Sequence, residues 1–82
     1  MDENAVRLER IFEGIFWTDP GPVTRKTREN TASWDSLAHL NLVLSIEQEF
    51  GIALADDEVV GMTAFGASLE IVRSKLQMRG EG

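Results

Sequence analysis

Three stretches of this chain place apolar residues at the spacing of one helix face, and this pattern limits the fold more than any other feature. Spacings of three and four residues are typical of amphipathic helices, and no segment sustains the alternation that predicts a strand. The sequence therefore predicts an all-α fold. The apolar faces are Ala5, Leu8, Ile11, Phe12, Ile15 and Phe16 in the first stretch, Leu37, Leu42, Val43, Ile46 and Phe50 in the second, and Phe65, Leu69, Val72 and Leu76 in the third.

Capping and breaking residues set the expected helix boundaries. Asp2 or Asn4 can cap the first helix and Asp35 the second, because their side chains accept hydrogen bonds from free N–H groups. Gly51 suits the left-handed residue that follows a helix. We expect a small bundle of three main helices plus one short helix, at residues 4–17, 36–50, 56–61 and 64–78.

A long polar connection, residues 18–33, separates the first two helices. Its length predicts a crossover between two roughly parallel helices, with a binding loop as the alternative. We expect this loop and the chain end at 79–82 to be the most mobile segments. Trp17 is expected to close the first helix, and Trp34 to pack the end of the loop onto the bundle.

Length and composition exclude several classes of protein. Eighty-two residues form one domain, 1–82, and the absence of cysteine with a single histidine excludes a disulfide framework and structural zinc. The net charge of −6 argues against nucleic acid as a partner, since such proteins need a basic face. Neither a secretory signal nor a membrane span is expected, which favours a cytoplasmic protein.

The charge imbalance is confined to one segment. Residues 35–58 contain no lysine or arginine and carry the whole net charge of −6. In the rest of the chain the acidic and basic residues are equal in number. Such a segment predicts an acidic face that could steer basic partners. The acids are Asp35, Glu47, Glu49, Asp56, Asp57 and Glu58.

Ser36 follows Asp35 at the expected start of the second long helix. Free N–H groups and the positive end of the helix dipole make this a suitable seat for a phosphate ester, although a serine there can also serve only as a cap. Asp35, Ser36 and His39 do not predict a catalytic triad, because all three lie within about one helical turn. We expect no catalytic residue, and we expect His39 at the surface.

The segment from Trp34 to Ile52, WDSLAHLNLVLSIEQEFGI, resembles the acyl carrier proteins. The resemblance extends over most of the chain through its length, its long first loop and its short acidic third helix. It implies that Ser36, flanked by Asp35 and Leu37, receives a 4′-phosphopantetheine arm from coenzyme A by the action of a phosphopantetheinyl transferase. The arm would supply the thiol that a chain without cysteine lacks, and the protein would be a carrier rather than an enzyme.

A second stripe on the same helix could serve docking. Leu40 and Leu44 lie on the side of Ser36, and acids surround them. The resemblance implies transient partners: the transferase, an acyl-loading enzyme, and enzymes of the ketosynthase or acyltransferase type. The alternative is that both leucines are core residues and the acids only a solvated face. The acids of the proposed docking surface are Glu47, Glu49, Asp56, Asp57 and Glu58.

The residues before the serine bear on the kind of carrier. Ser33 and Trp34 stand where the family commonly has a glycine and a small residue. The tryptophan form is similar to free-standing carriers of bacterial polyketide and mixed peptide–polyketide pathways, rather than to housekeeping carriers of fatty acid biosynthesis. An aminoacyl or peptidyl-type carrier is one alternative, and an unmodified acidic helical interaction module is another. We expect a monomer in each case.

Overall fold

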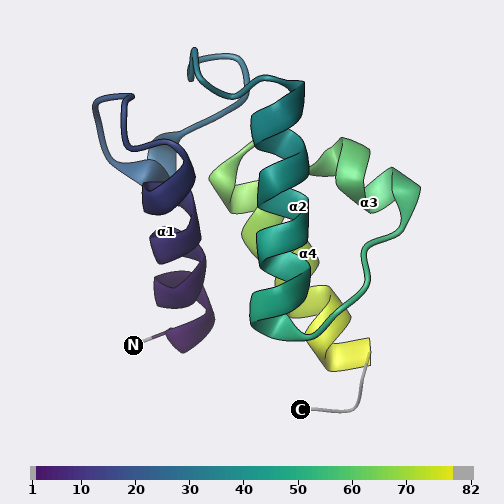
Figure 1. Ribbon diagram of the computed structural model, residues 1–82. Coiled ribbons are helices and arrows are strands. Elements are labelled where there is room, and N and C mark those ends of the chain that lie inside the picture. The colour runs from purple at the N-terminus through teal and green to yellow at the C-terminus, as the bar shows by residue number, and fades with distance from the viewer. Residues whose placement is uncertain (1, 79–82) are drawn as a thin grey trace.

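The computed structural model describes residues 2–78, and within them the chain is helical (Figure 1). The only sheet-like feature of this part is an isolated bridge between Thr27 and Ala64, which confirms the all-α prediction. The first helix ends two residues earlier than expected and the last begins one residue later. The elements are α1 (Glu3–Ile15), the 3-10 turn η1 (Val23–Arg25), α2 (Ser36–Phe50), α3 (Asp56–Gly61) and α4 (Phe65–Met78). The expected fraying at 79–82 lies outside the described residues.

The helix ends follow the capping chemistry of the sequence. The Asp2 carboxylate accepts hydrogen bonds from the N–H groups of Asn4 and Ala5, so Asp2 rather than Asn4 is the cap of α1. The Asp35 carboxylate accepts the Ala38 N–H at 2.8 Å. Gly51 ends α2 with a φ of 64°, a left-handed conformation that only glycine adopts at little cost.

The core forms where α1, α2 and α4 meet, and aromatic rings occupy its centre. Phe12 is fully buried, and its ring centroid lies 5.4 Å from that of Phe16, 5.5 Å from that of Trp34 and 5.0 Å from that of Phe65. Trp34 packs the loop onto the bundle, as expected. The other buried apolar residues are Leu8, Leu42, Val43, Ile46, Phe50, Ile52, Met62 and Val72.

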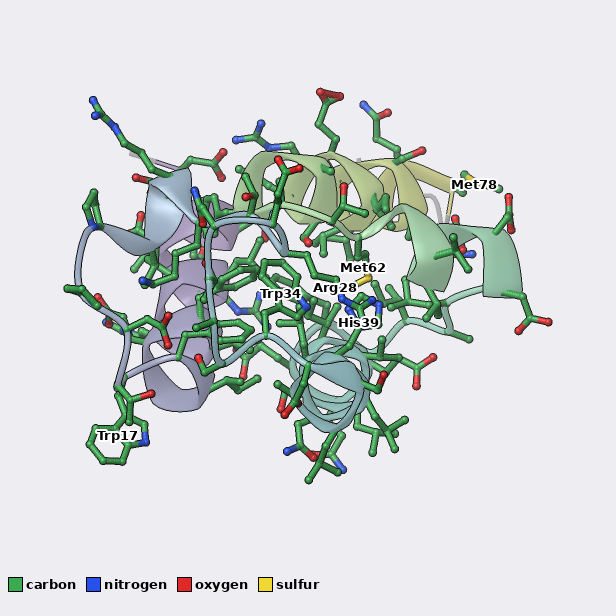
Figure 2. All side chains as sticks on the ribbon, turned by 90° about the horizontal axis from the view of Figure 1, so that it is seen from above. Trp17, Arg28, Trp34, His39, Met62 and Met78 are labelled. Carbon is green, nitrogen blue, oxygen red and sulfur yellow. The ribbon has the colours of Figure 1, made fainter. Side chains whose placement is uncertain are left out.

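Two predicted packing residues lie on the surface instead. Trp17 is 78% exposed and does not close α1, because the helix ends at Ile15 and the chain turns away. Leu37 is 68% exposed and does not extend the inward stripe of α2. It stands in the first turn, two residues before the inward-facing His39, and therefore on the outer side of the helix. Figure 2 shows Trp17 on the outside of the molecule and Trp34 in its interior.

The long loop does not connect parallel helices, because α1 and α2 run in opposite directions (Figure 1). Its extra length instead covers one end of the bundle. The buried Lys26 ammonium donates hydrogen bonds to the carbonyl oxygens of Asp19 and Pro20. The Arg28 N–H donates to the Thr63 carbonyl at 2.8 Å. The Lys26 bonds hold two parts of the loop together, and the Arg28 bond joins the loop to the α3–α4 junction.

Candidate functional site

Ser36 is the first residue of α2, and its side chain is exposed. The Asp35 carboxylate already caps the helix through the Ala38 N–H, so the Ser36 hydroxyl is not needed for that role. The first N–H groups of a helix lack partners within the helix and carry the positive end of its dipole. An exposed hydroxyl therefore stands where an attached phosphate would meet favourable electrostatics. The exposed Leu37 follows it.

His39 is buried, with 8% of its surface exposed, which corrects the prediction that it lies at the surface. The indole N–H of Trp34 donates to His39 Nδ1 at 3.0 Å, and His39 Nε2 lies 2.8 Å from the Val59 carbonyl oxygen. The imidazole is therefore engaged on both sides and is not available as a base for Ser36. The signal was present in the sequence, since His39 precedes Leu42 and Val43 by three and four residues.

The second stripe of α2 is exposed. Leu40 and Leu44 are 53% and 49% exposed, so neither is an ordinary core residue. Val60 on α3 is 75% exposed, and sequence reasoning did not single it out. Figure 1 shows α3 beside α2, on the side away from α1. Large apolar side chains of both helices are thus open to solvent.

Besides Asp35, which caps α2, three acids of the negative segment have partners within the molecule. The Glu49 carboxylate pairs with Arg7 of α1 at 2.7 Å, and the Glu47 carboxylate accepts the Leu54 N–H at 2.8 Å. Glu58 pairs with Lys75 of α4 at 3.1 Å. The ion pairs of Glu49 and Glu58 link α2 to α1 and α3 to α4, so counting charges within one segment did not reveal them. Within residues 2–78, Asp56 and Asp57 are exposed and form no ion pair.

Comparison with known proteins identifies the family. No family model matches the chain. The solved structure of the holo acyl carrier protein from Geobacter metallireducens is 32% identical to it, covers 98% of this chain and 93% of its own, and superposes with a TM-score of 0.78. This chain belongs to the acyl carrier proteins. Membership makes it a carrier with an acyl-carrier fold rather than a catalyst, as the resemblance implied.

The described part of this carrier contains no group of three His, Cys, Asp or Glu side chains that could hold a metal ion. No helix within residues 2–78 is long and apolar enough to cross a bilayer.

Glu58 connects the start of α3 to α4 in this carrier. Its Oε1 accepts the Ala55 N–H at 2.8 Å and faces the Lys75 ammonium. The hydrogen bond from Ala55, followed by the bond and charge of Lys75, lowers the pKa of Glu58. A lowered pKa means that the folded state favours the ionised carboxylate more than the unfolded state does.

We expect Glu58→Gln to lower the denaturation midpoint at neutral pH. A carboxylate with a lowered pKa contributes fully to the free energy of unfolding when the pH is above its pKa in the unfolded state. This contribution is lost as the pH falls through its pKa in the folded state. The difference from the parent should therefore shrink from about pH 5 to about pH 3. Urea denaturation of both proteins across this pH range checks the prediction. Glu70→Gln, at an exposed position on α4, is the control. A difference that stays constant with pH would contradict the assignment.

Proposed function

We propose that Ser36 carries a 4′-phosphopantetheine arm and that this protein delivers acyl groups to partner enzymes. The observation that carries the proposal is an exposed serine at the first position of α2, in a chain that matches a holo acyl carrier protein along nearly its whole length. Asp35 positions this serine by capping the helix, and the exposed Leu37 lies next to it.

The residues around Ser36 fit such a group. The hydroxyl is accessible to a transferase, and no hydrogen bond of the Asp35 cap has to break for it to react. Modification forms a phosphodiester at the serine oxygen and releases the nucleotide part of coenzyme A. The helix dipole at this end favours the negative charge of the phosphodiester.

The arm also explains how a chain without cysteine could carry a thioester. The chain has no cysteine, so it provides no thiol of its own. When attached, phosphopantetheine supplies the thiol that holds an acyl group as a thioester. The protein's own tasks are then to keep the end of α2 folded, to expose Ser36, and to present a surface that partners recognise.

Intact mass spectrometry tests the proposal directly. The apo protein is incubated with coenzyme A and a broad-specificity phosphopantetheinyl transferase, and we expect a gain of one phosphopantetheine group. A chain that stays unmodified while a known carrier is modified in the same mixture would instead favour the unmodified interaction module.

We also propose that partners dock on the exposed side of α2 and on α3. Leu40 and Leu44 supply apolar contacts, and Asp56 and Asp57 supply negative charge that no partner within residues 2–78 neutralises. Leu37 and Val60 extend the apolar area. Complementary charge mainly raises encounter rates and orients the partner. Glu47, Glu49 and Glu58 belong to the acidic rim, although each also has an internal bond.

Alanine variants of two leucines on α2 distinguish an effect on docking from an effect on stability. Leu44→Ala is expected to change the free energy of unfolding by less than about 1 kcal/mol, because the side chain is half exposed. Leu42→Ala, at a fully buried position, should cost about 2–5 kcal/mol. Leu44→Ala should nevertheless lower the transferase's kcat/KM severalfold. Denaturation and steady-state kinetics check both effects, and unchanged kinetics would remove Leu44 from the docking surface.

The partners proposed are the transferase, an acyl-loading enzyme and enzymes of the ketosynthase or acyltransferase type. Ser33 and Trp34 before the proposed attachment serine support a polyketide or mixed peptide–polyketide pathway. The carrier is proposed to act there as a cytoplasmic monomer. The mass of the thioester on protein isolated from its host tests this. An aminoacyl group would indicate the aminoacyl or peptidyl-type carrier, and a long saturated chain would indicate fatty acid synthesis.

A further inference from the structure

His39 connects the start of α2 to the end of the long loop and to α3. It stands on α2, three residues after Ser36, and bonds Trp34 at the end of the long loop on one side. On the other side it bonds the backbone of Val59 in α3, twenty residues further along the chain. Figure 2 shows its side chain in the interior, in the region of Trp34 and Met62.

The partners determine the state of the imidazole. An indole N–H can only donate, so His39 Nδ1 must accept the hydrogen bond from Trp34. The ring hydrogen therefore sits on Nε2, where it is donated to the Val59 carbonyl. A neutral imidazole satisfies both contacts, and the Trp34 and His39 rings lie 26° from parallel with centroids 6.1 Å apart.

The helix that His39 reaches has few other attachments. α3 contains six residues, none of them fully buried, and a helix this short is not stable without tertiary contacts. Val59 packs partly against the core, and Glu58 pairs with Lys75 of α4. The hydrogen bond from His39 to the Val59 carbonyl is a direct polar connection between α3 and the attachment-site end of α2.

We propose that His39 is a positioning residue that holds α3 and the end of the loop against the first turns of α2. The two helices then face a partner as one preformed surface around Ser36, which lowers the ordering that docking requires. This consequence rests on the proposed carrier function, whereas the structural connection does not.

Three variants test the connection in the apo protein. His39→Phe keeps a planar ring and removes both hydrogen bonds, and it should raise amide exchange in α3 about tenfold more than in α1, since each buried bond lost leaves a partner unsatisfied. His39→Gln retains one donor and one acceptor and should restore most of the protection. Trp34→Phe removes the indole N–H together with part of the buried ring that packs on Phe12 and Phe16. The part of its effect that passes through His39 should not add to that of His39→Phe.

Equal changes in α1 and α3, or a glutamine variant no better than phenylalanine, would overturn the proposal. Nitrogen NMR of the parent protein gives a test that needs no variant. It should show a single imidazole tautomer with the hydrogen on Nε2, and the other tautomer would refute the geometry.

Kinetics with the transferase then test the functional consequence. His39→Phe should raise KM for the carrier and leave kcat largely unchanged, and His39→Gln should restore KM. An unchanged KM in His39→Phe would refute the positioning role. Failure of every form, parent included, to be modified at Ser36 would refute the carrier function, and the exchange results would still decide whether His39 positions α3.

Discussion

Ser36→Ala is expected to abolish modification by coenzyme A and transferase completely. In the proposed reaction the new phosphodiester bond forms at the Ser36 oxygen, and alanine has no hydroxyl to take its place. Removing the hydroxyl should change the free energy of unfolding by no more than about 0.5 kcal/mol, because Ser36 is exposed and Asp35 provides the cap. The variant should thus stay folded while losing its entire function.

Intact mass and peptide mapping measure this effect. Ser74→Ala, at an exposed position on α4, is the matched control and should be modified like the parent. Circular dichroism of both variants shows whether the helices persist. A phosphopantetheine mass gain in folded Ser36→Ala would place the attachment elsewhere and contradict the proposed site.

Phe12→Ala is expected to have the largest effect on stability. Its ring is fully buried and contacts three other aromatic rings: Phe16 just after α1, Trp34 of the loop and Phe65 of α4. Truncating a buried phenylalanine costs about 3–5 kcal/mol through lost burial and the cavity left behind. Native proteins have about 5–15 kcal/mol in total, so this one substitution should remove a large share of the stability of the chain.

Urea denaturation followed by circular dichroism checks the expected loss. Trp17→Ala provides the aromatic control, because that side chain is 78% exposed and its removal should change stability by less than about 0.5 kcal/mol. A Phe12→Ala midpoint close to that of the parent would show that the core relaxes around the missing ring, contrary to the packing described.

The helices themselves could be predicted because their signals are local. Apolar spacing, the caps at Asp2 and Asp35 and the glycine at Gly51 all act within a few residues, and each appears where expected. The proposed attachment site rests on an equally local signal, since Ser36 stands beside the Asp35 cap in one short motif. Periodicity is less informative at helix ends, which is why Trp17 and Leu37 were wrongly assigned to the interior.

Sequence alone thus determined the helical class, the helix boundaries within two residues, and an exposed serine at the start of α2. Only the tertiary structure decided how those helices are directed and what the polar side chains contact. α1 and α2 are antiparallel, His39 is buried between Trp34 and Val59, and Glu47, Glu49 and Glu58 have internal partners. The contacts of His39 with Val59, Glu49 with Arg7 and Glu58 with Lys75 link different helices, and such hydrogen bonds and ion pairs depend on distances that appear only after the chain has folded.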